Sequence, residues 1–417
     1  MDISRRTALG LPLFAGGLYL VGTTNSSATN IGRPPPRMTE DMMQDAEGAW
    51  RYFTASTTGR KVGLTPAAIW PQGTGFGRYS TVTMWDVGSL VLALVSARSL
   101  QLISSDTFDE HLQATIKFLK RTSFRWNGAR LPNYRSHVDS LLSTEAGYDA
   151  TDMGRLLLAL YVLDQATSKA YDIGEIVGRW DIDKTIENGA LHDIKSSKRL
   201  PNAGNNYRYY IARSHRLWGF DVDRGYEGDL KGEDDRKEFV DQVLAVGAIA
   251  TEPSVNEIIE LGSSPHATLL SDMLYEAQRD RFIETGQLTA VSETPIDSQP
   301  WFTYQGFDPN GHGTFAWPVH SMVTDKKWQT EAFAKRFRMV NTKAAFLWHA
   351  LRADAYARKL RAFASSEAQT SSLGFVPGIY ESSGTKPKIM DINTNGLVLE
   401  SLAYIANGRK PLVDIRL

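Results

Sequence analysis

The sequence predicts a mainly helical protein, an (α/α) six-hairpin toroid with short β-hairpins in its loops. Apolar residues recur with the helical period along most of the chain after residue 39. Strand and helix segments do not alternate, so a doubly wound sheet is disfavoured. The sequence has no strict short repeat, so an open solenoid is also disfavoured. About ten antiparallel helices of this kind pair as hairpins, and a ring of hairpins leaves a cleft at one end.

The helices follow from apolar positions at i, i+3, i+4 and i+7. This pattern predicts helices over 39–56, 83–101, 107–121, 149–167, 205–219, 236–249, 266–285, 327–336, 342–365 and 393–406. Stretches rich in Gly, Pro and Asn, such as 70–77 and 308–313, separate these segments and are predicted to be loops. Strand-like pieces near 185–200 and 288–304 predict small hairpins within the loops.

The N-terminus has the pattern of an export signal. Ser4-Arg-Arg-Thr-Ala-Leu-Gly10 is a twin-arginine motif, and the apolar run that follows it, 11–21, is short and interrupted by Gly and Pro. We therefore expect a signal peptide over 1–28, a polar tether over 29–44 and one toroid domain over 45–412. The expected location is periplasmic or secreted, with no stable membrane span after processing; a retained membrane anchor is the alternative.

Composition excludes several classes of function. The 417 residues carry a net charge of −1 and no run rich in Lys or Arg, which disfavours a nucleic-acid partner. The chain has no cysteine, so it has neither disulfides nor thiolate ligands. Its histidines lack the spacing of a metal motif. We expect no metal and no cofactor.

Acidic residues stand where helices or long loops begin, beside Trp or Tyr. The four that we select are Asp86, Asp152, Glu252 and Glu293. Each one alone suits a helix N-cap or a partner of the helix dipole. Together they suit glycoside chemistry, in which one carboxyl protonates the leaving oxygen and another activates water or attacks the anomeric carbon. We predict Glu293 as the general acid and Asp86 or Asp152 as the base, with Glu252 in reserve.

Aromatic and polar side chains near these acids are the predicted substrate contacts, because flat rings stack on sugars while Asn, Arg and Lys bond hydroxyl groups. Two asparagines within three positions at 393–395 are more than one helix cap requires. The predicted binding residues are Trp85, Arg155, Asp297, Trp301, Tyr304, Lys343, Asn393 and Asn395.

Several longer motifs resemble a bacterial family known as domain of unknown function 3131. They are Thr83-Met-Trp-Asp-Val-Gly-Ser89, Leu131-Pro-Asn133, Thr151-Asp-Met-Gly-Arg-Leu-Leu157, Leu217-Trp-Gly-Phe220, Thr285-Gly-Gln-Leu-Thr-Ala-Val-Ser-Glu293, Lys343-Ala-Ala-Phe-Leu-Trp-His349 and Asn393-Thr-Asn-Gly-Leu-Val-Leu-Glu400. They span about residues 45–412. The resemblance implies a likeness to six-hairpin toroid glycosidases, such as glucoamylase-like and β-1,2-glucan-processing enzymes, by analogy of fold.

The chain departs from that family pattern at one place. Where the pattern has Tyr followed by Glu, this chain has Tyr207 followed by Arg208. If that acid is catalytic in relatives, the present chain would bind glycan without cleaving it, unless Glu227 in the next loop substitutes.

These observations lead to one main functional hypothesis. We expect an exported glycoside hydrolase or transglycosylase that acts on a bacterial glucan or exopolysaccharide, with an oligo- or polysaccharide as its partner. A noncatalytic glycan-binding protein of the envelope, or a polysaccharide lyase on the same fold, are the alternatives.

Overall fold

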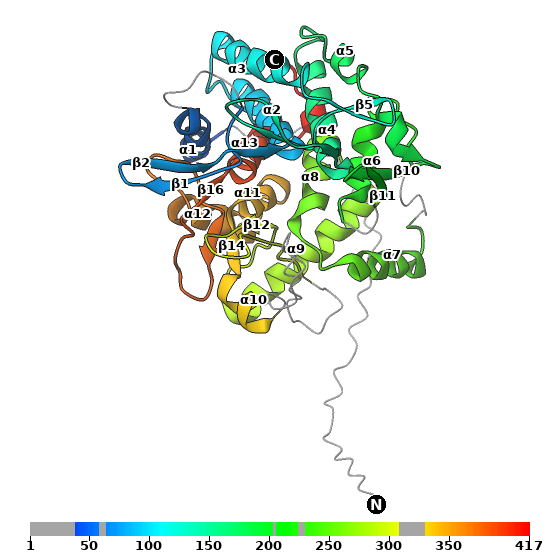
Figure 1. The fold of residues 1–417 in the computed structure, drawn as a ribbon. Coiled ribbons are helices and arrows are strands. Elements are labelled where there is room, and N and C mark those ends of the chain that lie inside the picture. Colours follow the sequence, from blue (N-terminus) through cyan, green and yellow to red (C-terminus); the bar gives the residue numbers. More distant parts are fainter. Residues whose placement is uncertain (1–37, 58–63, 203–205, 224–229, 308–329) are drawn as a thin grey trace, which may run out of the picture. The chain divides into compact units, whose positions relative to one another are not determined.

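The computed structural model describes residues 38–57, 64–202, 206–223, 230–307 and 330–417. Within these ranges, six helices pack side by side in a closed ring (Figure 1). In ring order they are α2 (Met84–Ser99), α4 (Ala150–Ala166), α6 (Arg208–Arg216), α8 (Thr251–Leu261), α11 (Thr342–Leu351) and α13 (Ile392–Ala406). Helix α13 packs against α2 and so closes the ring. Nearly every residue of α2 is buried, as expected of a helix that other helices surround.

A second set of helices covers the ring from outside. It comprises α1 (Glu40–Thr57) on α13, α3 (Ser105–Leu119) on α2, α5 (Ile173–Val177) on α4, α9 (Pro265–Thr285) on α8 and α12 (Ala355–Glu367) on α11. Helix α7 (Glu233–Val246) lies against α6, where Phe239 packs edge-on to Tyr209. Inner and outer helices therefore alternate along the chain, and the predicted (α/α) toroid is confirmed.

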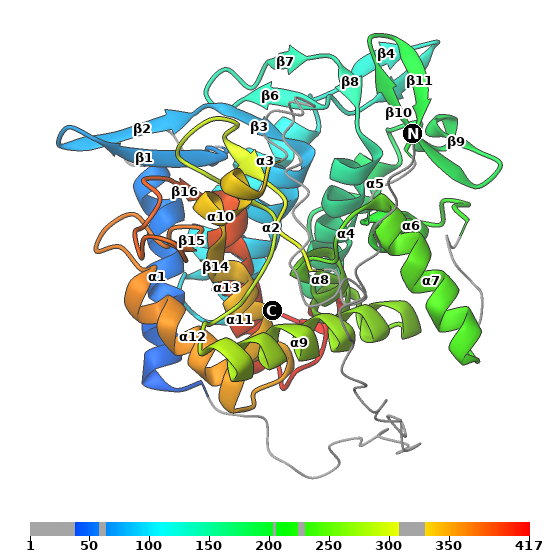
Figure 2. The ribbon, with the colours of Figure 1, turned by 90° about the horizontal axis from the view of Figure 1, so that it is seen from below.

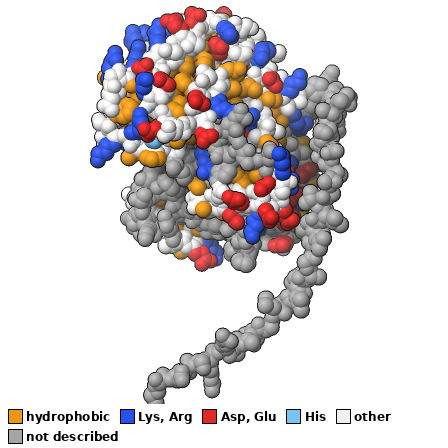
Figure 3. All heavy atoms as spheres, turned by 90° about the vertical axis from the view of Figure 1, so that its right-hand side faces the viewer, with side chains coloured by type: hydrophobic (Ala, Val, Ile, Leu, Met, Phe, Trp, Pro, Cys, Tyr) orange, Lys and Arg blue, Asp and Glu red, His pale blue; other side chains and the backbone are white. Residues whose placement is uncertain are grey.

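The outer helices are amphipathic, with one apolar stripe toward the ring. Helix α3, for example, buries Phe108, Leu112 and Phe118. Helix α7 begins with three acids, Glu233 to Asp235, which suit the positive end of its dipole. Acidic side chains gather on the face of the molecule that carries this helix (Figure 3).

Short antiparallel strands lie along one end of the ring (Figure 2). The strands are β1 (Ala68–Gln72), β2 (Gly75–Tyr79), β3 (Thr81–Thr83), β4 (Phe124–Trp126), β5 (Ala129–Leu131), β6 (Arg135–His137), β7 (Ser143–Glu145), β8 (Gly147–Tyr148), β9 (Ile186–Glu187), β10 (Ala190–Lys195), β11 (Lys198–Pro201), β12 (Thr294–Pro295), β13 (Phe302–Thr303), β14 (Met339–Asn341), β15 (Gly378–Tyr380) and β16 (Met390–Asp391). Two of the sheets have the strand orders β16-β1-β2 and β3-β6-β7. Strands β3, β8, β14 and β16 lead directly into α2, α4, α11 and α13. These connections fix where the inner helices begin.

Side chains cap several of these helix starts. Thr83, Asp149, Asn341 and Asp391 each accept a hydrogen bond from a backbone N–H in the first turn of the helix that follows. The first turns of α2 and α13 contact each other, because Trp85 Nε1 donates to Asn393 Oδ1 at 3.3 Å. The positive ends of the inner helices therefore meet at one end of the ring.

Two predicted elements differ from the structure. The predicted loop at 70–77 is mostly strand, because Gly73 adopts a φ of 59° and turns β1 back onto β2. The single helix predicted over 342–365 is two helices, α11 and α12. Ala353 between them has a φ of 55°, and Asp354 caps the second helix through the N–H of Ala357. Apolar periodicity runs across this break because both helices face the same core.

The remaining predicted elements agree with the structure or lie partly outside the described residues, but the helix ranges predicted from the sequence omit α5 and the inner helix α8. The hairpins predicted near 185–200 and 288–304 are present as β9–β11 and β12–β13. Helix α10 (Glu331–Phe337) covers the described part of the segment predicted over 327–336, and short 3-10 helices lie at Ile182–Thr185 and Leu412–Asp414.

The N-terminal predictions are only partly covered. The predicted signal peptide lies outside the described residues, and α1 begins at Glu40, inside the predicted tether. By its internal contacts, Pro35–Leu417 forms one unit. Among the helices that the structure describes, none is both long and apolar enough to cross a membrane.

Candidate active site

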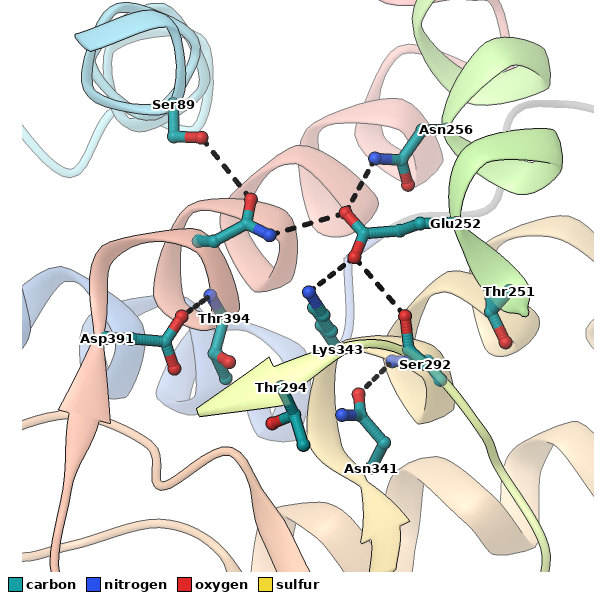
Figure 4. Close-up of polar contacts among 12 residues, drawn as sticks. Ser89, Thr251, Glu252, Asn256, Ser292, Thr294, Asn341, Lys343, Asp391 and Thr394 are labelled. Atoms are coloured by element: carbon teal, nitrogen blue, oxygen red, sulfur yellow. Dashed lines mark hydrogen bonds and ion pairs between the residues drawn. The ribbon is translucent and has the colours of Figure 1, made fainter. Parts of the chain in front are cut away.

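The Glu252 carboxylate is held by four side chains where the inner helices begin. Asn256 Nδ2 and Asn393 Nδ2 donate to its Oε1 at 2.9 and 3.4 Å, and Ser292 Oγ donates to its Oε2 at 3.2 Å. The Lys343 ammonium forms an ion pair with the same Oε2, and both side chains are almost fully buried. Lys343, Ser292 and Asn256 point toward this carboxylate from three segments (Figure 4). A buried carboxylate with a cation and three further donors is satisfied in its charged form.

Glu293 follows Ser292 directly and has a different environment. It is 7% exposed, the Tyr304 hydroxyl hydrogen-bonds to its carboxyl, and the Tyr207 phenol interacts with it electrostatically. Burial, and then the negative charge of Glu252, raise the pKa of Glu293 to about 7, against the opposing effect of Lys343 and the two tyrosines. Glu293 therefore still carries its proton just below neutral pH, as a general acid must.

Asp86 and Asp152 form a second acidic group in the first turns of α2 and α4. Asp86 Oδ2 accepts a hydrogen bond from Thr83 N at 2.8 Å, and the Thr83 side chain also acts to lower the pKa of Asp152. Burial raises the pKa of Asp86 to about 6, with a further contribution from Asp391. Burial and the charges of Asp149 and Asp86 raise the pKa of Asp152 well above its usual range. Asp86 is therefore the one of the pair that ionises just below neutral pH.

Tyr304 interacts electrostatically with acids of both groups, Glu293 and Glu252 in the first and Asp152 in the second. The pKa of its phenol is raised first by Glu293, then by burial, and also by Asp152 and Glu252. The charge of Asp86 in turn raises the pKa of Asp152. The structure thus brings all four predicted acids to the end of the ring where the inner helices begin. Their catalytic roles stay a prediction.

Four of the predicted binding residues lie among these acids. Lys343 and Asn393 hold Glu252, and Tyr304 bonds to Glu293. The Trp85 indole donates to Asn393, and its ring lies 5.0 Å from that of Tyr207.

Arg155 lies deeper in the ring than predicted. Its side chain is fully buried, forms ion pairs with Glu260 and Glu400, and donates to the Tyr210 hydroxyl at 3.0 Å. Its guanidinium lies 5.3 Å from the Trp85 ring centre. All of these partners belong to the inner helices. Arg155 therefore supports the site from below, and its substrate contact stays a prediction.

Asn395 is also turned into the protein. Its Oδ1 accepts from Phe375 N at 2.8 Å, and its Nδ2 donates to the carbonyls of Phe375 and Asp391 at 3.1 and 2.9 Å. These bonds attach the start of α13 to the loop before β15. The excess of asparagine at 393–395 thus serves two purposes, because Asn393 faces Glu252 while Asn395 faces the core.

Asp297 and Trp301 lie on the loop that joins β12 to β13. Glu293 precedes β12 and Tyr304 follows β13, so the catalytic candidate and its tyrosine stand at the base of this hairpin. Trp301 is 59% exposed at the far end. Asp297 is exposed and accepts from the Tyr380 hydroxyl and Lys388 N, both at 2.9 Å. These two residues lie on the exposed loop of the hairpin, and their substrate contacts stay a prediction.

Four site residues were not predicted from the sequence. Asn256 and Ser292 donate to Glu252, and Tyr207, which interacts electrostatically with Glu293, ends the loop before α6. Asp391 caps α13 at 2.7 Å from Thr394 N and interacts electrostatically with Lys343 and Glu252. Asp391 precedes the same polar stretch that contains Asn393 and Asn395. A polar residue at this position is also expected of an ordinary helix cap, so the sequence alone does not mark Asp391 as a site residue.

Arg208, where this chain departs from the family pattern, directly follows the site residue Tyr207. Its Nη2 donates to the Tyr209 hydroxyl at 2.9 Å, and its guanidinium lies 5.0 Å from the Tyr209 ring centre. Glu227, the predicted substitute acid, is outside the described residues. Over the part of the chain that the structure describes, no cluster of three His, Asp or Glu side chains could hold a metal ion.

Fold and site together define a six-hairpin (α/α) toroid with buried acids where its inner helices begin. The chain belongs to the family described as protein of unknown function (DUF3131), whose model matches residues 44–408. The resemblance seen in the sequence motifs is thereby confirmed. No curated protein matches the sequence.

Solved structures share this fold at low sequence identity. An endo-β-1,2-glucanase from Chitinophaga pinensis has a TM-score of 0.64 and 12% identity, over 91% of this chain and 94% of its own. A glucoamylase-like protein from Bacteroides caccae has a TM-score of 0.61 and 11% identity, over 89% and 96%. A D-mannose isomerase has a TM-score of 0.53 and 12% identity, over 88% and 97%. One toroid thus supports more than one chemistry, and the function must be argued from the site.

Proposed function

We propose that this protein is a glycoside hydrolase or transglycosylase that acts on a bacterial glucan. The observation that carries the proposal is Glu293, a buried carboxyl beside two tyrosines and the Glu252 carboxylate, with a pKa of about 7. The chemistry needs a carboxyl that is protonated near neutral pH and a second one that is ionised. The structural likeness to an endo-β-1,2-glucanase and to a glucoamylase-like protein supports a glucan as substrate.

In the proposed hydrolysis, Glu293 gives its proton to the glycosidic oxygen as the bond from that oxygen to the anomeric carbon breaks. Asp86, ionised above about pH 6, accepts a proton from the attacking water, whose oxygen bonds to the anomeric carbon. In transglycosylation, a sugar hydroxyl takes the place of the water. Asp152 is the less suitable base because its neighbours favour its protonated form.

Glu252 has a different part in this scheme from the reserve acid or base that the sequence suggested. Four donors occupy its two oxygens and hold the carboxylate in place. Its charge instead opposes ionisation of Glu293. Lys343 keeps that charge in place, and Asn393 connects Glu252 to Trp85.

The test is the release of reducing ends from a panel of polysaccharides, beginning with linear β-1,2-glucan. Wild-type protein and Glu293→Gln are compared, with Glu276→Gln as a matched control, because Glu276 is exposed on the outer helix α9. We expect turnover by wild type and by the control, and loss of turnover in Glu293→Gln. Full activity in Glu293→Gln refutes the assignment.

The same panel separates the alternatives. Binding without turnover, unchanged when each of the four acids is neutralised, identifies a glycan-binding protein. Unsaturated products that absorb in the ultraviolet identify a lyase.

We also propose that the protein is exported to the periplasm or secreted through the twin-arginine pattern at residues 4–10. Replacing both arginines with lysine is expected to retain the full-length protein inside the cell. Unchanged fractionation of that variant contradicts export by this route.

A further inference from the structure

We infer that Tyr79, with Trp70 and Arg135, forms an additional subsite that binds a neutral glucan chain several sugar units long beside the acids. This inference rests on the proposed function, since it concerns the same substrate.

The sheet β16-β1-β2 places Tyr79 on the same face as a site residue. In its register, Asp391 pairs with Ala68, and Ala68 pairs with Tyr79. Side chains of residues paired across antiparallel strands project from the same face. Ile69, the neighbour of Ala68, is fully buried, so the opposite face packs on the core. Tyr79 therefore projects on the outward face, in the row that begins with the cap of α13.

Trp70 lies on this same face, two residue pairs further along the hairpin. It is paired with Gly77, and a Cβ placed on Gly77 would lie 2.3 Å from Trp70 Nε1. The missing side chain of Gly77 therefore lets the indole lie across the strand. Tyr79 is 53% exposed, which is unusual for so large an apolar ring. Two aromatic rings on one exposed sheet face are suited to the apolar faces of sugar rings.

Arg135 connects this aromatic face to the acids. Its guanidinium interacts electrostatically with the Tyr79 hydroxyl, and with both Asp86 and Asp152. It also lies 4.6 Å from the Tyr134 ring centre and donates to the Tyr134 hydroxyl at 3.0 Å. A chain bound across Tyr79 would therefore lead toward Asp86.

The cation beside this face is already paired, which favours a neutral chain. Arg135 forms an ion pair with Glu145 at 3.3 Å. A polyuronate would have to displace this carboxylate, whereas hydroxyl groups can hydrogen-bond to the paired groups as they stand. The subsite therefore fits a glucan better than an acidic polysaccharide.

The experiment compares chain lengths. Wild type, Tyr79→Ala and Tyr79→Phe are assayed with β-1,2-linked glucotriose and with long linear β-1,2-glucan, and Ile283→Ala is the control because it removes an apolar side chain that is 71% exposed on α9. We expect Tyr79→Ala to lower kcat/KM on the long chain about tenfold and to leave the trisaccharide unaffected, because a stacking contact is lost. Tyr79→Phe and Ile283→Ala should keep the wild-type rates. An equal loss on both substrates, or no loss on either, overturns the subsite.

A binding measurement keeps this test separate from the proposed function. In gels that contain long β-1,2-glucan, the migration of wild type should be retarded, and Tyr79→Ala should remove most of the retardation. Retardation that depends on Tyr79 without any turnover supports the subsite and refutes the hydrolase. Turnover with retardation that does not depend on Tyr79 refutes the subsite and leaves the hydrolase intact.

Discussion

Replacing Lys343 with methionine should destabilise the protein strongly. Methionine keeps most of the volume of the side chain but removes the cation that neutralises Glu252. Because Lys343 is 1% exposed and Glu252 is also buried, water cannot take the place of the lost charge. Removing one partner of a buried ion pair costs about 3–5 kcal/mol. That is a large part of the roughly 5–15 kcal/mol by which folded proteins are stable.

The assay is equilibrium urea unfolding followed by tryptophan fluorescence, with the midpoint and slope compared between variants. Lys117→Met on the exposed face of α3 is the matched control and should unfold as wild type does. The double variant Lys343→Met/Glu252→Gln should regain about 2 kcal/mol or more, because neutral Gln needs no cation. If Lys343→Met unfolds at the wild-type urea concentration with the same slope, the ion pair does not hold this end of the ring.

Two further predictions concern the protons of the site. The pH profile of kcat/KM on β-1,2-glucan should be bell-shaped. It should rise through about pH 6 as Asp86 ionises and fall through about pH 7 as Glu293 loses its proton. A profile that is flat between pH 5 and 8 contradicts both assignments. Glu293→Gln should also stabilise the fold at pH 8 by up to about 3 kcal/mol, because a folded pKa of about 7 against an ordinary value of 4.5 means that folding opposes the ionised form. This stabilisation should be absent at pH 4, where the wild-type carboxyl is protonated in both states, and equal unfolding midpoints for the two proteins at pH 8 would contradict the raised pKa.

The helical ring could be predicted because its signals are local. Caps at Thr83, Asp149 and Asp391 precede apolar runs, and those runs are three of the six inner helices, α2, α4 and α13. The break at Ala353 was missed because apolar periodicity continues through a residue with positive φ. The hairpin at β1–β2 was missed because its glycines suggested a loop, although Gly73 makes the turn and Gly77 makes room for Trp70.

The acids of the candidate site could be predicted from the sequence, but the burial of Arg155 and the position of Tyr207 could not. Acids that follow helix caps must lie where helices begin, and a toroid gathers those ends. Arg155 lies one turn beyond Asp152 on the same helix, and that one turn places it among buried carboxylates. Tyr207 came to Glu293 only through closure of the ring, a contact between distant segments that sequence spacing does not encode.

The central claim is that Glu293 protonates the leaving group, and its most direct test varies that leaving group. Glu293→Gln is assayed on β-1,2-glucan and on a dinitrophenyl β-glucoside. The dinitrophenolate of the second substrate leaves without needing a proton. We predict a loss of about 10²–10⁴ in kcat on the glucan and little loss on the aryl substrate. An equal loss on both substrates, or none on the glucan, would contradict the account.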